Sequence, residues 1–161
     1  MSPEQVAFIS KCSISARMVG TNFPDMVGCE AALESAFGQS ELARDYNNLF
    51  GMKAKQHPDF GTVNLPTREF QDGQWITISA KWENYPTLED CFADRLATLT
   101  RLKSVYPHYA AALAADNAET YVQEVSKTWS TDPNRAFKCI SIYRDYTDTI
   151  TAPPPLIPKA P

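Results

Sequence analysis

The chain has 161 residues, of which 43% are hydrophobic and 21% are charged. This is the length of one ordinary globular domain, with a composition that supports a sizeable core. A net charge of −4, with no basic stripe among its 15 lysines and arginines, argues against nucleic acid as the main ligand. No apolar run reaches the roughly 20 residues that span a bilayer. The N-terminus also lacks the features of a secretory signal, so we expect a protein made in the cytoplasm, without membrane insertion.

The cysteines are spread along the chain and form no Cys-x-x-Cys pair, and the two histidines lack a zinc-binding spacing. Each cysteine lies in a segment of periodic apolar residues, where a free thiol behaves as a small buried hydrophobic group. We therefore expect four free thiols, no metal site and no cysteine nucleophile. The four residues are Cys12, Cys29, Cys91 and Cys139.

Two helices are predicted before residue 40. Ser2 and Gln5 form a capping box that opens the first helix, which runs to about Val19. The second helix opens near Pro24 and carries apolar residues at helical spacing until Gly38 ends it.

The middle of the chain changes character. Ser40 is expected to cap a short helical turn, and residues 47–51 (Asn-Asn-Leu-Phe-Gly) are typical of a tight turn. Between Gly61 and Ala80 the residues favour strands, and Asp72-Gly73 is a strong hairpin signal between them.

Helices resume at Thr87, which caps a long amphipathic segment that reaches about residue 102. Two shorter helices are predicted, over residues 109–115 and 119–129. The last helix is predicted to start at Asp132, with Pro133 at its first position. Its expected buried residues are Phe137, Ile140 and either Tyr143 or Tyr146.

Five of the twelve prolines lie between residues 153 and 161, so residues 151–161 are predicted to be a proline-rich tail or linker. Residues 1–150 are predicted to form the folded domain. A helical body, a small β-hairpin lobe and a cleft between them make an α+β plan.

Glu34 is the first candidate for chemistry. It lies near the end of the second helix, between Leu33 and Phe37. A carboxyl group held among apolar side chains keeps a proton more readily and can donate it to a leaving oxygen. The alternative is a surface glutamate on an amphipathic helix.

Two motifs in register resemble the glucosaminidase family of peptidoglycan hydrolases, glycoside hydrolase family 73, which includes autolysins, phage lysins and flagellar-rod hydrolases. They are residues 31–43 (Ala-Ala-Leu-Glu-Ser-Ala-Phe-Gly-Gln-Ser-Glu-Leu-Ala) and 47–53 (Asn-Asn-Leu-Phe-Gly-Met-Lys). The downstream order is similar as well, with Thr67-Arg68-Glu69-Phe70, Tyr85 with Thr87, and Thr131-Asp132-Pro133. The resemblance runs from about Val6 to Ile150.

The resemblance implies a lysozyme-like α+β fold and an endo-β-N-acetylglucosaminidase that cleaves glycan strands without a cofactor. It implies that Glu34 is the general acid and that Glu69, on the hairpin lobe, is a second catalytic acid. An exposed strand glutamate is the alternative for Glu69. The rival acids are Glu30, Glu41, Asp72 and Glu83.

Several residues are candidates for substrate contact. The amides of Asn47 and Asn48 suit either a tight turn or an N-acetyl group. Aromatic rings either stack on sugar faces or fill the core. The aromatic candidates are Phe50, Trp75, Trp82, Tyr85 and Trp129.

This chain departs from the family pattern at three places. Trp82-Glu83 replaces a common Phe-Arg, Trp129-Ser130 replaces a common Tyr-Ala, and Arg135 follows Asn134 where tyrosine is frequent. All three lie outside the segment that carries the acid.

Alternative functions stay open. A muramidase or a lytic transglycosylase would cut the other bond of the same polymer, and a non-catalytic cell-wall-binding module is a further alternative. The expected partner is the peptidoglycan glycan strand, reached in the periplasm or outside the cell after delivery or lysis. We expect a monomer, with an immunity protein or a fused domain as a further partner.

Overall fold

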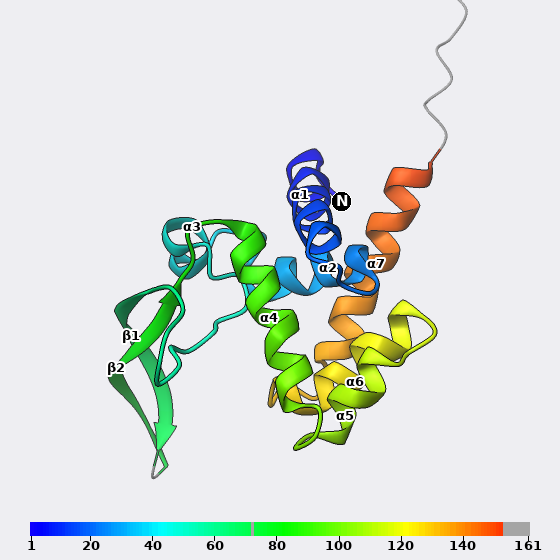
Figure 1. The fold of residues 1–161 in the computed structure, drawn as a ribbon. Coiled ribbons are helices and arrows are strands. Elements are labelled where there is room, and N and C mark those ends of the chain that lie inside the picture. The colour runs from blue at the N-terminus through cyan, green and yellow to red at the C-terminus, as the bar shows by residue number, and fades with distance from the viewer. Residues whose placement is uncertain (72, 153–161) are drawn as a thin grey trace, which may run out of the picture.

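A helical body and one long β-hairpin make up the part of the chain that the structure describes (Figure 1). The structure is a computed structural model that describes residues 1–71 and 73–152, with residues 68–71 and 75 described by their backbone alone. The elements are α1 (Pro3–Met18), α2 (Pro24–Glu34), α3 (Glu41–Tyr46), β1 (Gly61–Gln71), β2 (Gln74–Asn84), α4 (Leu88–Leu102), α5 (Pro107–Leu113), α6 (Ala118–Trp129) and α7 (Arg135–Thr151). The predicted α+β class is confirmed. None of these helices has both the length and the apolar character needed to cross a bilayer.

Three helices start where their capping residues predict. Ser2 and Gln5 form the expected capping box at α1. The Ser40 hydroxyl accepts a hydrogen bond from the Ala43 backbone N–H at the start of α3. Thr87 forms a second capping box with Asp90 at the start of α4. These bonds pair backbone N–H groups that the first turn of a helix leaves without a partner.

The second helix ends earlier than predicted, at Glu34 instead of Gly38. Ala36, Phe37 and Gly38 follow it with φ angles of 50°, 56° and 79°. Left-handed backbone is unfavourable for residues other than glycine, so other bonds must hold this turn. The buried Ser35 hydroxyl accepts from the Gly38 N–H at 2.8 Å and donates to the Ala31 carbonyl at 2.6 Å. Glu34 is therefore the last residue of α2, directly before a tightly fastened turn.

The last helix starts at Arg135, three residues later than predicted. Asp132 accepts hydrogen bonds from the backbone N–H groups of Asn134 and Arg135, which closes a turn before the helix. The prediction that Phe137 is buried is wrong, because 74% of it is exposed. Phe137 lies about 200° around the helix from Arg135, and Arg135 is the residue that faces inward. Tyr146 is buried as predicted.

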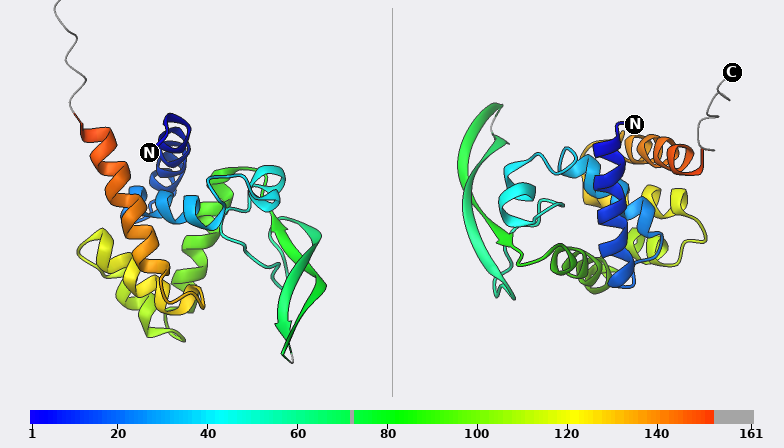
Figure 2. Two further views of the ribbon diagram at one scale, coloured as in Figure 1. Left: turned by 180° about the vertical axis from the view of Figure 1, so that it is seen from behind. Right: turned by 90° about the horizontal axis from the view of Figure 1, so that it is seen from above.

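The hairpin joins its two strands antiparallel, from the pair Gly61–Asn84 to the pair Gln71–Gln74. The β2 strand runs to Asn84, four residues beyond the predicted end. These extra residues pair with residues 61–64 of β1. They also contact the segment before the hairpin, since the Glu83 N–H donates to the Met52 carbonyl at 3.1 Å. The hairpin lies on the side of the helical body away from α7 (Figure 2). Residues 153–161, where the proline tail is predicted, lie outside the described residues.

The root of the hairpin is fastened to the body by the Asn47–Gly51 turn. The Asn48 Nδ2 donates to the carbonyls of Met52 and Glu83, both at 2.9 Å, and its Oδ1 accepts from the Met52 N–H at 2.8 Å. The Asn47 Nδ2 donates to the Tyr85 carbonyl at 3.0 Å. The turn therefore connects the end of α3 with the end of β2.

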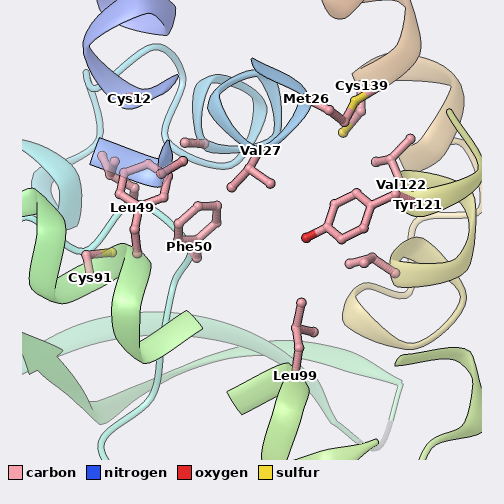
Figure 3. Close-up of a cluster of buried hydrophobic side chains, with 14 of the residues drawn as sticks. Cys12, Met26, Val27, Leu49, Phe50, Cys91, Leu99, Tyr121, Val122 and Cys139 are labelled. Atoms are coloured by element: carbon pink, nitrogen blue, oxygen red, sulfur yellow. The ribbon is translucent and has the colours of Figure 1, made fainter. Parts of the chain in front are cut away.

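The core lies between the helices and the Asn47–Gly51 turn (Figure 3). Val27 of α2, Phe50 of the turn, Leu99 of α4 and Tyr121 of α6 all meet there, each at most 4% exposed. All four cysteines are buried and free, as the sequence predicts.

We expect Asn48→Asp to destabilise the protein more than Asn48→Ala. Alanine leaves three backbone groups without their partner, which costs about 1–3 kcal/mol. Aspartate also sets a carboxylate against the two carbonyls that now receive hydrogen bonds, and we expect at least about 1 kcal/mol more. Urea denaturation measures both losses, with the exposed Asn64→Asp as the control. Equal losses for the two Asn48 variants would contradict the bonds described above.

We expect all four thiols to react with a chromogenic disulfide reagent in denaturant without reductant, and to react slowly in the native protein. Burial raises the pKa of the thiols of Cys12, Cys91 and Cys139 to about 12, and it also raises the pKa of Cys29. At pH 8 the native thiols therefore stay protonated as well as shielded. A count below four in denaturant would indicate a disulfide and contradict the expectation of four free thiols.

Candidate functional site

Glu34 lies at the C-terminal end of α2 with its side chain 26% exposed. Its Oε1 accepts a hydrogen bond from the Nε of Arg135 at 2.6 Å. The strained turn after α2 fixes the helix end that carries this carboxylate. Strained backbone of this kind concentrates at functional sites. Glu34 is thus a solvent-accessible carboxylate on a rigid support.

Glu30 lies one helical turn earlier and is fully buried. Its Oε2 accepts from the Nη2 of Arg95 at 2.7 Å, and its Oε1 accepts from the Nη2 of Arg135 at 3.0 Å. Both oxygens are therefore paired with cations, and none of the side chain reaches solvent. Glu30 is placed to hold the two arginines and not to meet a substrate.

Arg95 completes the cluster from α4. Its Nη1 donates to the Tyr121 hydroxyl at 2.8 Å, and its guanidinium carbon lies 4.7 Å from the ring centre of Phe50 and 5.1 Å from that of Trp129. Burial alone would lower the pKa of Arg95, but the neighbouring Glu30 and Tyr121 raise it above its usual range. The buried guanidinium therefore stays charged. We refer to Glu30, Glu34, Arg95 and Arg135 as the ion cluster.

Glu69 lies on β1, opposite Ile76 in the hairpin. Its side chain is outside the described residues, and so is the rival acid Asp72. The assignment of Glu69 as the second acid stays a prediction.

The two remaining rival acids differ in exposure. Glu83 is fully buried, and its Oε1 accepts from the Lys55 backbone N–H at 2.9 Å. Glu41 is exposed in the first turn of α3 and borders a pocket of about 280 Å³ between α3 and the hairpin. Glu41 is thus the one of these two that solvent reaches.

Most of the predicted substrate contacts lie in the supporting frame. The amides of Asn47 and Asn48 bind backbone carbonyls, as described above. Phe50 and Tyr85 are 4% and 1% exposed, and the Tyr85 hydroxyl donates to Asp94 at 2.7 Å. These side chains therefore support the structure around the site. The Trp75 side chain lies outside the described residues.

Trp129 lies at the edge of a larger pocket, of about 900 Å³, formed by the end of α6 and the segment that leads into α7. Ser126 also lines this pocket, and its hydroxyl accepts from the Nη1 of Arg135 at 2.9 Å. The pocket is therefore connected to Glu34 through a single guanidinium. An aromatic side chain at the edge of an open pocket suits a sugar face.

The two buried arginines were missed by sequence reasoning, although each had a signal. Arg95 lies in the apolar stripe of its helix, one turn after Cys91 and one turn before Leu99. A cation at such a position indicates a buried partner of opposite charge. Arg135 stands out in the sequence only as a departure from the family pattern, because it follows Asn134 where tyrosine is frequent.

Comparisons with known proteins agree with this architecture. The Glucosaminidase family model, described as mannosyl-glycoprotein endo-beta-N-acetylglucosaminidase, matches residues 14–148. A probable N-acetylmuramidase of Lactococcus lactis subsp. lactis is 32% identical over 151 residues, which are 89% of this chain and 34% of that protein. Exo-glucosaminidase LytG of Bacillus subtilis is 33% identical over 150 residues, which are 89% of this chain and 52% of that protein.

A solved structure shows the same fold. The catalytic domain of the autolysin Auto from Listeria monocytogenes superposes with a TM-score of 0.80 at 26% identity, over 93% of this chain and 88% of that domain. The chain spans about half or less of the length of the curated relatives it matches. The family match covers most of the chain and includes both the acid motif and the ion cluster, and the chain therefore belongs to the Glucosaminidase family.

Proposed function

We propose that this chain is a peptidoglycan hydrolase, an endo-β-N-acetylglucosaminidase that cleaves the glycan strand with Glu34 as its general acid. The observation that carries the proposal is the placement of Glu34. It is the one carboxylate of the ion cluster that reaches solvent, and it ends a helix within the segment that the family model matches. The description of the family, an endo-beta-N-acetylglucosaminidase, names the same class of bond.

In the proposed reaction, protonated Glu34 donates its proton to the glycosidic oxygen as the bond to the anomeric carbon breaks. The oxocarbenium-like charge is then met by a water that Glu69 activates, or by the carbonyl of the substrate's own N-acetyl group. The separation between the two carboxyl groups distinguishes inverting from retaining chemistry. Acid catalysis of this kind by carboxyl groups requires no cofactor.

A second candidate function is cleavage of the other glycosidic bond. The name of the lactococcal relative, a probable N-acetylmuramidase, favours it. The two activities share the polymer and the acid, and they differ in which sugar occupies the subsite before the cleaved bond. The reducing-end sugar of the products therefore separates them.

Because peptidoglycan lies outside the cytoplasmic membrane, the proposed activity requires release or export of the chain. A holin gene beside its own gene would indicate a phage lysin, and an immunity gene would indicate a secreted effector with an inhibitory partner.

We expect Glu34→Gln to lower the rate of cell-wall lysis by at least ~10²-fold, because the amide is nearly isosteric but cannot donate the required proton. The variant should still fold, because the amide oxygen can accept the hydrogen bond from Arg135, but its melting temperature should fall, since one buried charge of the ion cluster loses its partner. Glu119→Gln is the matched control, since Glu119 also pairs with an arginine of α7, Arg144, but lies outside the cluster. Turnover by Glu34→Gln within a few-fold of the wild type would assign the acid to another residue.

Glu69→Gln tests the second step. If Glu69 activates water, its loss should depress activity nearly as far as the loss of Glu34, and added azide should restore part of it by acting as the nucleophile. If the N-acetyl carbonyl is the nucleophile, the loss should be smaller and azide should have no effect. A fully active Glu69→Gln enzyme would remove Glu69 from the mechanism.

A further inference from the structure

Arg135 contacts the proposed acid, Glu34, directly. It is the first residue of α7, and its side chain is 1% exposed. Its guanidinium donates through three nitrogens to three groups on two other helices: Nε to Glu34, Nη2 to Glu30 and Nη1 to Ser126. A planar guanidinium has these donors in fixed directions, so it cannot rotate without breaking at least one bond.

We infer that Arg135 is a positioning residue that directs the catalytic proton to the Oε2 of Glu34, an inference that rests on the proposed acid role of Glu34. Arginine carries only donors and cannot accept a hydrogen bond. The Oε1 of Glu34 faces the Nε–H of Arg135 at 2.6 Å, so a proton on Oε1 would point at another proton. The proton of the neutral acid must therefore sit on Oε2.

Oε2 is the oxygen of Glu34 that stays available to a substrate, since the Glu34 side chain is 26% exposed. In the described part of the chain no hydrogen bond reaches it, whereas Oε1 is held by Arg135. The carboxyl group is therefore fixed by one oxygen and presents the other. Since a general acid must meet the leaving oxygen at hydrogen-bond distance, a fixed carboxyl plane favours productive transfer.

Arg135 also stabilises the group that proton transfer produces. As Glu34 loses its proton it becomes a carboxylate, and the guanidinium already lies in place to receive the new charge. A prearranged donor of this kind needs no reorganisation during the reaction. Glu30 keeps the guanidinium in place, because its Oε1 accepts from Arg135 and its Oε2 accepts from Arg95. Burial opposes the charge of Arg135, but Glu30 and Glu34 raise the pKa of Arg135 above its usual range.

The test compares Arg135→Met, Arg135→Lys and Tyr121→Phe in the full chain, with kcat and KM measured on soluble peptidoglycan fragments. Arg135→Met should lower kcat by at least ~10-fold, with KM within ~3-fold of the wild type, because substrate binding stays and orientation is lost. The kcat of Arg135→Lys should lie between those of the wild type and Arg135→Met. The lysine ammonium keeps the positive charge but cannot hold both carboxylates in the same geometry.

Tyr121→Phe is the matched control. It removes the hydrogen bond that Arg95 of the ion cluster donates to the Tyr121 hydroxyl, and it leaves Glu34 and Arg135 unchanged. It should lower the melting temperature and leave kcat within ~2-fold of the wild type. If its kcat falls as far as that of Arg135→Met, the cluster acts through stability alone and the inference fails.

A further pair of outcomes separates this inference from the proposed function. An inactive Glu34→Gln enzyme together with a fully active Arg135→Met enzyme would overturn the inference and keep the acid. An active Glu34→Gln enzyme would overturn both. Where Arg135→Met does not fold, Glu30→Gln/Arg135→Met removes one charge of each sign and should show the same loss of kcat, and unchanged kcat in that variant would contradict the inference.

Discussion

Two arginines share one buried glutamate, and the arrangement of the helices around the proposed acid depends on this contact. Glu30 on α2 binds Arg95 on α4 and Arg135 on α7, and the arginines in turn reach Tyr121 and Ser126 on α6. A buried ion pair adds little net stability over an apolar core, but removing one partner leaves an uncompensated charge that costs about 3–5 kcal/mol. The helices α2, α4 and α7 therefore cannot shift relative to one another without leaving a charge unpaired, and α6 is tied to both arginines by hydrogen bonds. The end of α2 is thereby held with Glu34 reaching solvent.

The hairpin differs from the helical body in what stabilises it. A two-stranded ribbon is marginally stable on its own and depends on its attachment, which here is the turn that Asn48 fastens to Met52 and Glu83. The proposed acid thus rests on a rigid support, while the proposed second carboxylate rests on an element with few packing partners. Such a division suits an enzyme that has to admit a long polymer and then bring a second group to it.

Local signals in the sequence predicted most of the fold. Each capping bond joins residues within one helical turn, so it can be predicted from the local sequence. The capping residues are Ser2, Ser40 and Thr87. The end of α2 and the buried face of α7 were harder to predict from the sequence, because long-range contacts determine them. Arg135 faces inward because Glu30 and Glu34, about a hundred residues earlier, accept its hydrogen bonds. The motif around Glu34 identifies this residue as the proposed acid, but it does not predict the cation that binds it, Arg135.

The reducing-end sugar of the products is the most direct test of the account. Purified peptidoglycan would be digested with the protein, reduced with borohydride and analysed by mass spectrometry, with the Glu34→Gln protein as the blank. The account predicts new chains that end in reduced N-acetylglucosamine, and none in the blank. Chains that end in reduced N-acetylmuramic acid or in its anhydro form would contradict the proposed bond, and equal products from the Glu34→Gln protein would contradict the proposed acid.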